Sequence, residues 1–356
     1  MSPTNKIIHF TSDISTAALR CLPAELAHEI GMSILSKKIH RLLPKPKYIS
    51  EIDLTTEIEG IGRLWHPIGL AAGFDKNASA VEGFNDLDFS FIEVGTVTPR
   101  PQLGNKKPRL FRLKDQNAII NRMGFNNHGL EVMRRTLSAG DYGSKGITLG
   151  INLGKNKDTP MEAAVNDYID GLFGLKEHGK YFVVNISSPN TPGLRDLASK
   201  DFLRDLAYEI TLKDAELIKR VWVKVDPDLD KDNFQSLIEG IKAYGYAGVI
   251  LTNTHRVELP EMGGQSGHPL AVMSTLRLEW AYEASNGSLP MIGVGGIMSG
   301  GDVYQKIIRG AKLVQIYSSL VYRGPWVVLK LLEELEWELK LHGHKNLQDA
   351  CGSFYR

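Results

Sequence analysis

The sequence has little cysteine and almost no net charge, and each shortage excludes a class of protein. Cys21 and Cys351 are the only cysteines, far apart and without metal-ligand spacing. This argues against a disulfide scaffold, a zinc site and a catalytic cysteine, and it is typical of a reducing compartment. The 42 Lys and Arg residues balance 41 Asp and Glu residues to a net charge of +1, so nothing indicates nucleic-acid binding.

Long hydrophobic runs are also missing. No stretch approaches the roughly 18 apolar residues of a membrane span, and the N-terminus lacks the basic-then-apolar layout of a signal peptide. We therefore expect an intracellular protein. The hydrophobic share of 42% and charged share of 23% are ordinary for a globular chain, and 356 residues suit one large domain with insertions.

Eight short apolar runs recur from residue 68 onward, at intervals that suit strand-helix units rather than hairpins. They show little alternation, which is typical of parallel strands covered on both faces. The runs are 68–72, 91–95, 147–152, 181–186, 221–225, 248–252, 291–294 and 313–317. They predict an α/β fold, a closed (β/α)8 TIM barrel, with a doubly wound open sheet as the alternative.

Polar or glycine residues follow nearly every run on its C-terminal side, where barrel enzymes place their chemistry. They are Gly73, Gly95, Asn152, Asn185, Lys224, Thr252, Asn253, Gly295, Gly296 and Ser318. The glycines also suit ordinary turns, and a salt bridge with Asp226 is the alternative for Lys224. The repeated amides favour a polar ligand.

Two segments lie outside this repeat. Residues 96–146 are too long for a simple crossover, and 109–113 with 118–122 predict a hairpin that overhangs the mouth. Residues 11–43 place leucines and isoleucines at helical spacing before Pro44. On its residues alone, that segment favours a helix packed on its own domain over a membrane-surface element.

Two loops carry candidate chemistry. Residues 292–296 and 317–319 follow the seventh and eighth strands, where barrels bind phosphate, so either a flavin mononucleotide or a sugar phosphate would suit them. Residues 185–193 put two amides, two serines and a threonine on a proline-stiffened loop. A serine there can act as base on a carbon-bound proton if a relay removes its own proton; ordinary turn hydrogen bonding is the alternative.

These residues resemble the membrane-associated, quinone-linked (class 2) dihydroorotate dehydrogenases of pyrimidine biosynthesis. The resemblance runs from about residue 22 to residue 326. It rests on the motifs GLAAGFDK (69–76), EVGTVTPRP (93–101), INRMGFN (120–126), NLGKNK (152–157), NISSPNTPGLR (185–195), TNT (252–254) and IGVGG (292–296).

The resemblance implies oxidation of (S)-dihydroorotate to orotate, with FMN as hydride acceptor and a membrane quinone as final acceptor. Ser188 would be the catalytic base, with Thr191 and Phe125 shaping the proton relay. The implied substrate set is Lys76, Asn121, Arg122, Met123, Gly124, Phe125, Asn185, Asn190, Asn253 and Thr254. The implied FMN set is Ala72, Gly73, Thr96, Asn152, Asn185, Lys224, Thr252, Gly267, Gly296, Tyr317 and Ser318. No metal is implied.

The resemblance also reverses the expectation for the N-terminus, because PAELAH (23–28) is similar to the family's quinone-tunnel signature. Residues 1–45 are then expected to form an amphipathic helical membrane and quinone-tunnel segment, and residues 46–356 the FMN-binding barrel. His28, Arg112 and Tyr317 are the expected quinone path. The implied location is peripheral, on the cytoplasmic side of a cell inner membrane or on the mitochondrial inner membrane of a eukaryote.

Three features depart from the family's pattern. Asp226 stands where a small residue is usual, His255 replaces a threonine, and the loop 255–262 is short; they bear on substrate access and rate more than on reaction type. The soluble class and the tRNA dihydrouridine synthases would need a cysteine, and the α-hydroxy-acid oxidases a histidine at the mouth. A barrel that only binds a pyrimidine or a membrane would not need Ser188, Thr191 and Lys224 together.

Overall fold

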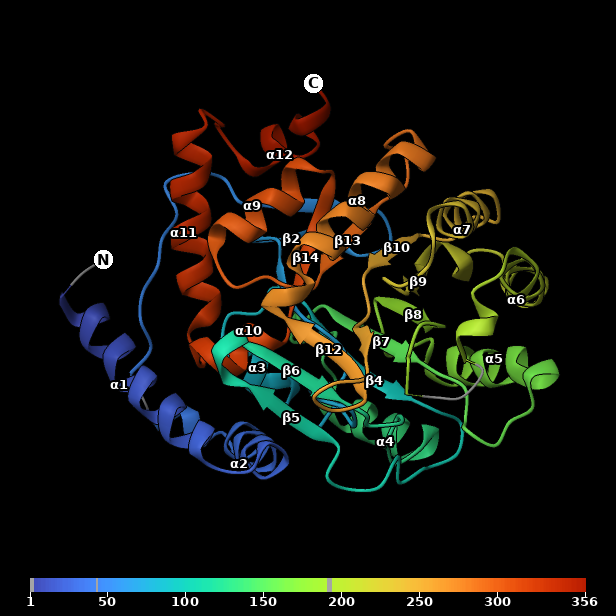
Figure 1. Cartoon of the computed structure of the whole chain (residues 1–356), viewed down its shortest axis with the longest axis horizontal. Helices are drawn as coiled ribbons and strands as arrows, with labels where there is room; N and C mark the ends of the chain where they lie inside the picture. Colours follow the sequence, from blue (N-terminus) through green and yellow to red (C-terminus); the bar gives the residue numbers. More distant parts are fainter. Residues whose placement is uncertain (1–2, 43, 191–193) are drawn as a thin grey trace.

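The computed structural model describes residues 3–42, 44–190 and 194–356, and a closed parallel barrel forms its centre (Figure 1). Around the barrel, each strand pairs with the next in the chain and the last pairs with the first. The strands are β3 (Ile68–Leu70), β4 (Ile92–Val97), β7 (Leu149–Leu153), β8 (Tyr181–Asn185), β9 (Val221–Val225), β10 (Gly248–Leu251), β13 (Met291–Val294) and β14 (Ala311–Ile316). Closure confirms the predicted barrel and excludes the open sheet.

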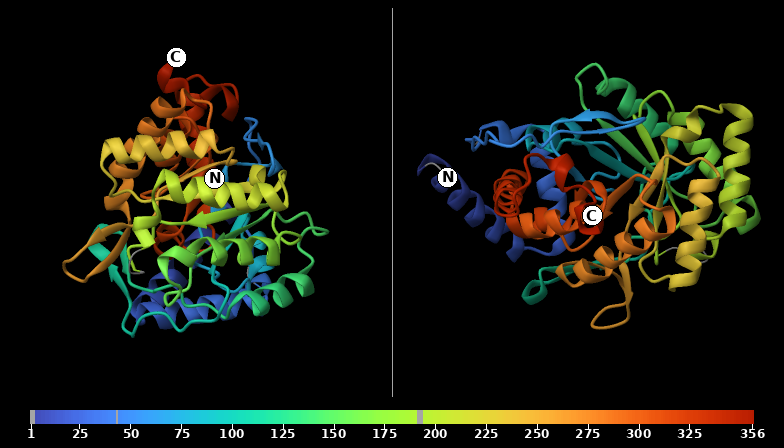
Figure 2. Two further views of the ribbon diagram at one scale, coloured as in Figure 1. Left: turned by 90° about the vertical axis from the view of Figure 1, so that its right-hand side faces the viewer. Right: turned by 90° about the horizontal axis from the view of Figure 1, so that it is seen from above.

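Helices surround the barrel, as Figure 2 shows in two further views, and their buried apolar side chains join the core. In α6, for example, Phe202, Leu206 and Ile210 are buried at helical spacing, and Ser199 caps the first turn by accepting from the Phe202 backbone N–H. The helices after β3 are α3 (Val81–Asp86), α4 (Leu130–Gly140), α5 (Ala164–Leu175), α6 (Lys200–Lys213), α7 (Lys231–Ala243), α8 (Ala271–Ser285), α9 (Gly300–Ile308), α10 (Ser318–Arg323), α11 (Val327–Leu341) and α12 (Leu347–Ala350).

Aromatic rings fill the lower part of the barrel, which is the end where the strands begin. Tyr181 and Trp222 are fully buried there and meet edge to face, with ring centroids 6.3 Å apart. Glycines make the room: a Cβ at Gly150 would lie 2.1 Å from the Tyr181 ring, and one at Gly248 would lie 2.4 Å from the Trp222 ring. A hairpin of β1 (Thr56–Ile58) and β2 (Gly62–Leu64) packs onto this cluster. The lower barrel is therefore a packed core, and a site can open only at the opposite end.

A four-stranded antiparallel sheet lies over the C-terminal end of the barrel. Its strand order is β11 (His255–Val257), β12 (Gly263–Gly267), β6 (Ala118–Asn121) and β5 (Leu110–Leu113). The predicted β5–β6 hairpin is confirmed. The other two strands were not predicted, because the sequence of β12 is GGQSG and has no apolar residue to mark a strand.

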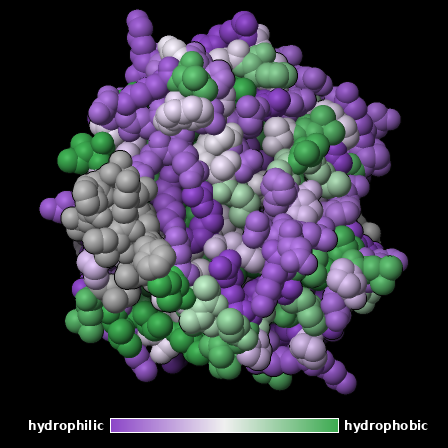
Figure 3. All heavy atoms as spheres, turned by 60° about the vertical axis from the view of Figure 1, so that its left-hand side comes forward, coloured by the Kyte–Doolittle hydropathy of each residue, from purple (hydrophilic) through white to green (hydrophobic). Residues whose placement is uncertain are grey.

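Two helices precede the barrel, α1 (Pro3–Cys21) and α2 (Ala24–Ser36), with Pro23 between them. The helix predicted within 11–43 is therefore a pair, and the first helix begins earlier. The pair contacts α10, α3 and β5. Ile14, Leu26, Ile39 and Leu42 are exposed, and Figure 3, which brings this side forward, shows hydrophobic side chains gathered along its lower edge. Within the described residues, no helix has both the length and the apolarity to cross a membrane.

Short 3-10 turns complete the chain. They are η1 (Ile39–Leu42), η2 (Lys114–Gln116), η3 (Met161–Ala163), η4 (Leu194–Leu197), η5 (Leu217–Arg220), η6 (His268–Leu270) and η7 (Ser353–Tyr355). The fourth of them matters for the site, because it ends the loop that begins at the C-terminus of β8.

Candidate active site

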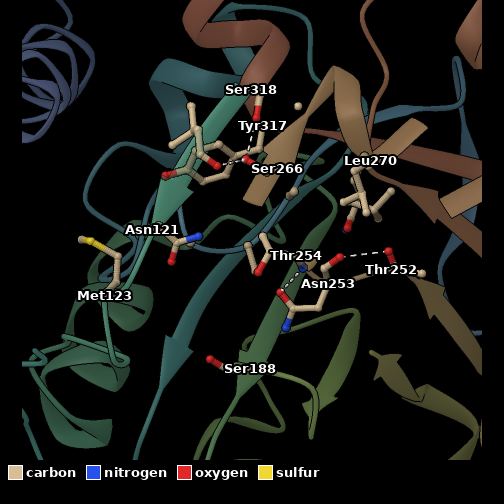
Figure 4. Close-up of a pocket in the computed structure, with 18 of the residues that line it drawn as sticks. Asn121, Met123, Ser188, Thr252, Asn253, Thr254, Ser266, Leu270, Tyr317 and Ser318 are labelled. Carbon is tan, nitrogen blue, oxygen red and sulfur yellow. Dashed lines mark hydrogen bonds between the residues drawn. The ribbon is translucent and has the colours of Figure 1, made fainter. Parts of the chain in front are cut away.

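A cavity opens where the barrel strands end, beneath β5, β6 and β12, and it collects most of the predicted site residues (Figure 4). The strand ends and the covering sheet supply different walls, so residues far apart in sequence face one space. The predicted residues that line it are Ala72, Gly73, Lys76, Thr96, Asn121, Met123, Gly124, Phe125, Asn185, Ser188, Asn190, Lys224, Thr252, Asn253, Thr254, Gly267, Gly296, Tyr317 and Ser318.

Other predicted residues do not line the cavity. Asn152 is fully buried behind the wall, where its Oδ1 accepts from Thr96 Oγ1 at 2.6 Å. The Arg122 guanidinium turns away to Glu261 at 2.9 Å and stacks over the Phe111 ring. Thr191 lies outside the described residues, so its part in the predicted relay stays a prediction.

Hydrogen bonds hold the amides that line the cavity. Asn190 Nδ2 donates to Asn121 Oδ1 at 3.1 Å, which joins the loop after β8 to β6. Asn253 Nδ2 donates to Ser187 Oγ at 3.0 Å, and Asn253 Oδ1 accepts from the Thr254 backbone N–H at 2.8 Å. Figure 4 shows Asn121, Asn253 and Thr254 converging from different elements. Fixed amides offer both donors and acceptors, which suits a flat ring with alternating N–H and C=O groups.

Ser188 lies on the loop after β8, across the cavity from Tyr317 and Ser318 in Figure 4. It is 7% exposed, and its Oγ accepts from the Asn190 backbone N–H at 3.3 Å. Phe125, on the covering segment, has a φ of +53°, a left-handed conformation that a bulky residue rarely adopts. Such conformations persist where the surroundings hold them, often at functional sites.

Two lysines supply positive charge. Lys76 Nζ donates to the Gly73 carbonyl at 2.7 Å, and burial, with the charge of Arg109, lowers the pKa of Lys76 to about 8. Burial also lowers the pKa of Lys224, against the opposing charge of Glu93. Because a bound anion would favour the protonated form of each lysine, both are suited to anionic groups in the cavity.

The loops after β13 and β14 form a cradle of backbone and hydroxyl groups. Gly296 has a φ of +75°, and a Cβ there would lie 2.1 Å from the Ala271 Cα. Ser266 and Ser318 hydroxyls are 2.8 Å apart across the cradle. Sequence reasoning missed Ser266 and Gln315, which also line the cavity; Ser266 lies on the glycine-rich β12, and Gln315 is hidden inside an apolar strand.

Aromatic rings connect the cavity with α2. Tyr317 lines the cavity and lies 5.0 Å from the Phe74 ring, which lies 5.1 Å from the His28 ring. Burial lowers the pKa of His28 to about 4 and raises the pKa of Tyr317 to about 12, so both are neutral near pH 7. Arg112 donates to the carbonyls of Leu19 and Leu22, at the turn between α1 and α2. Of the predicted quinone residues, His28 and Tyr317 are therefore joined through Phe74, and Arg112 lies at the turn before α2.

Fold and cavity together define the class: a (β/α)8-barrel protein with a polar cavity at the C-terminal ends of its strands, where barrel enzymes place their active sites. Across residues 3–42, 44–190 and 194–356, no group of three His, Cys, Asp or Glu side chains could hold a metal ion. The family model described as dihydroorotate dehydrogenase matches residues 53–339. The chain belongs to the dihydroorotate dehydrogenase family.

Individual relatives agree over most of the chain. It is 45% identical over 301 residues to the dihydroorotate dehydrogenase (quinone) of Gloeobacter violaceus, covering 82% of this chain and 84% of the relative. It is 40% identical over 368 residues to the mitochondrial dihydroorotate dehydrogenase (quinone) of Mus musculus, covering 98% and 91%. The crystal structure of DHODH from Eimeria tenella with ferulenol superposes with a TM-score of 0.86 at 38% identity, covering 93% of this chain and 96% of that one.

Proposed function

We propose that the chain oxidises (S)-dihydroorotate to orotate, with FMN as hydride acceptor and a membrane quinone as final electron acceptor, in the synthesis of UMP. The observation that carries the proposal is the set of amides that lines the cavity together with Ser188, in a chain of this family. A catalytic hydroxyl facing a ring-shaped set of donors and acceptors suits proton removal from a bound heterocycle.

The substrate would lie between the amides and Ser188. Lys76 would bind the carboxylate, and Asn121, Asn185, Asn190, Asn253 and Thr254 would hold the ring, with Met123, Gly124 and Phe125 closing the covering side. Arg122 is included in the substrate set because it belongs to the same motif as Met123 and Gly124. Its guanidinium itself is bound by Glu261. Ser188 Oγ would take the proton from C5, with Thr191 and Phe125 shaping the relay that removes the hydroxyl proton.

The residues present fit FMN. A phosphate suits the cradle at Gly296 and Ser318, where the absence of a side chain brings the backbone close. The flat ring suits Ala72, Gly73, Thr96, Lys224 and Thr252, backed by Asn152 and Asn185, with Gly267 and Tyr317 at its edge. Gln315 Oε1 is buried there without a hydrogen-bond partner among the described residues, so it is available to a ligand donor. When bound, FMN accepts the hydride that leaves C6.

We further propose that residues 1–45 are the membrane and quinone-tunnel segment and residues 46–356 the FMN-binding barrel. The exposed hydrophobic side chains of α1, α2 and η1 and the route through His28, Arg112 and Tyr317 support this. The chain would then associate peripherally with the cytoplasmic side of the inner membrane, or with the mitochondrial inner membrane in a eukaryote.

Anaerobic titration of the FMN-loaded protein with dihydroorotate tests the reaction. We expect the 450 nm region absorbance of oxidised flavin to bleach without nicotinamide. Ser188→Ala should slow this bleaching by about 10²-fold or more, the usual range for losing a general base. Ser144→Ala is the matched control, because it removes a hydroxyl at an exposed position away from the cavity and should bleach at the native rate. Equal rates for the native protein and Ser188→Ala would exclude Ser188 as the base.

A further inference from the structure

Glu93 places a carboxylate inside the barrel, directly beneath the candidate active site. It lies on β4, two residues before Gly95, and is fully buried. Its Oε1 accepts from Asn152 Nδ2 at 2.8 Å. Its Oε2 accepts from Gln315 Nε2 at 2.5 Å and from the Tyr181 hydroxyl at 3.3 Å. Four strands of the barrel therefore meet at one carboxylate.

A buried charge is costly, and neutral donors alone compensate it only in part. Lys224 on β9 lines the cavity above this carboxylate, and the charge of Glu93 opposes the effect of burial on the pKa of that lysine. An apolar side chain would fill the same space without this cost, as the buried Phe91 does just before β4 begins. The carboxylate is therefore expected to serve the cavity above it.

Glu93 fixes the orientation of two amides, Gln315 in the wall of the cavity and Asn152 behind that wall. Because Asn152 Nδ2 points at Glu93, Asn152 Oδ1 must turn to Thr96 Oγ1 and to Asn185 Nδ2, at 2.6 and 3.1 Å. Because Gln315 Nε2 points at Glu93, Gln315 Oε1 is the atom left without a partner among the described residues. The Glu93 carboxylate thus determines which atom of Gln315 is available to a ligand and, through Asn152, how Thr96 and Asn185 are held.

We propose that Glu93 is a positioning residue that sets the redox properties of the bound flavin: it orients Asn152 and Gln315, and its fixed negative charge weakens the hold of Lys224 on the reduced, negatively charged cofactor. This rests on the proposed function. Weaker binding of the reduced form lowers the reduction potential and favours electron transfer onward to the acceptor. Lys224 alone would do the opposite, so the balance between the two charges sets the potential.

The test is the midpoint potential of the bound FMN, measured for every variant against the same reference dye and at the same pH. Glu93→Gln keeps the size of the side chain and removes the charge. We expect the affinity ratio of reduced to oxidised FMN to rise at least tenfold, which is a potential about 30 mV more positive for two electrons. Glu93→Asp keeps the charge and should stay near the native potential.

Tyr181→Phe is an independent test, in which the affinity ratio of reduced to oxidised FMN should change in the opposite direction. It removes one donor to the carboxylate, so the charge of Glu93 is less compensated and the affinity ratio should fall. Gln315 Nε2 also donates to this hydroxyl at 3.3 Å, but it keeps its shorter bond to Glu93. This variant also decides the matter if Glu93→Gln does not retain FMN. An unchanged ratio in Tyr181→Phe, or equal shifts in Glu93→Gln and Glu93→Asp, would overturn the proposal. The measurement uses no dihydroorotate, so a protein that holds FMN but does not oxidise dihydroorotate would contradict only the proposed function.

Discussion

Asp226 Oδ2 lies 2.5 Å from Arg195 Nε, at the point where the loop after β8 meets the end of β9. Arg195 also reaches Asp228, at 3.0 Å. Asp226 was considered above as a partner for Lys224, but its carboxylate is engaged by Arg195, and Glu93 is the charge that acts on Lys224. Asp226 therefore anchors the far end of the segment that carries Ser188.

Replacing Asp226 should change how stability depends on pH. Burial raises the pKa of Asp226 to about 6, against a usual value near 4. Since the folded state keeps the proton longer than the unfolded state, the contribution of Asp226 to stability is present at low pH and is lost as pH rises through this window. Between pH 5 and pH 7.5 the native protein should lose about 1 kcal/mol of free energy of unfolding that Asp226→Asn does not lose, measured by urea denaturation.

Asp228→Asn is the matched control for that measurement. Burial acts to raise the pKa of Asp228, but hydrogen bonds from His255 and the Arg256 backbone lower it overall. Its stabilising contribution is therefore present above the usual aspartate pKa, so Asp228→Asn should lose stability at neutral pH. Because the pKa of Asp228 is lowered, this loss should be the same at pH 5 and at pH 7.5. A difference between the two pH values that is as large in Asp228→Asn as in Asp226→Asn would contradict the assignment.

The cradle at Gly296 should be intolerant of a single methyl group. In Gly296→Ala the new Cβ would lie 2.1 Å from the Ala271 Cα, and the φ of +75° disfavours alanine. The loop must move, so we expect the FMN dissociation constant to rise at least tenfold, about 1.4 kcal/mol. Gly143→Ala, with nothing within 4 Å of its Cβ, should bind FMN normally in the same fluorescence titration.

The barrel could be predicted from sequence because each parallel strand is buried on both faces and reads as a continuous apolar run. The eight predicted strands differ from the observed ones by at most two residues at either end. β12 could not be predicted in this way, because its sequence lacks apolar side chains and its strand conformation depends on pairing with β6. The start of α1 was not predicted, because its first four residues, PTNK, include none of the leucines and isoleucines that mark the helix further along.

Site residues could be predicted where they directly follow the end of a strand. They could be predicted less well where the direction of the side chain determines whether it reaches the cavity. Asn253 and Lys224 line the cavity as expected, since the end of a parallel strand fixes where its last residues face. Arg122 shares a motif with Asn121, yet its side chain points the other way toward Glu261, because alternate residues of an extended segment face opposite sides. Glu93 is part of a motif, but no role could be predicted for it, because the sequence does not reveal which residues from other strands lie beside it inside the barrel.

His66 should make the fold sensitive to acid. The Ile68 backbone N–H donates to His66 Nδ1 at 3.2 Å, and His66 Nε2 lies 2.9 Å from the Asp88 carbonyl, an arrangement that needs a neutral ring. Burial lowers the pKa of His66 to about 4. For a depressed histidine pKa, stability is present above the usual pKa near 6.5 and is lost as pH falls toward 4.

Between pH 7.5 and pH 5, His66→Gln should therefore lose about 1–2 kcal/mol less free energy of unfolding than the native protein. Glutamine can replace both hydrogen bonds without titrating. His128→Gln, at an exposed position, is the control and should follow the native curve. Parallel curves for His66→Gln and the native protein would show that the ring does not titrate as the hydrogen bonds require.

Arg112→Gln should separate the two half-reactions. The guanidinium donates to the carbonyls of Leu19 and Leu22 and so holds the turn between α1 and α2, while it lies outside the residues that line the cavity. Losing hydrogen bonds from a charged donor costs about 1.5–3 kcal/mol, so we expect kcat/KM for quinone to fall about tenfold or more. Anaerobic bleaching by dihydroorotate should keep its native rate. Arg63→Gln, on the exposed hairpin at the opposite end of the barrel, is the matched control. If Arg112→Gln slowed bleaching and quinone reduction by the same factor, the arginine would act on the cavity itself, and the quinone route would have to be placed elsewhere.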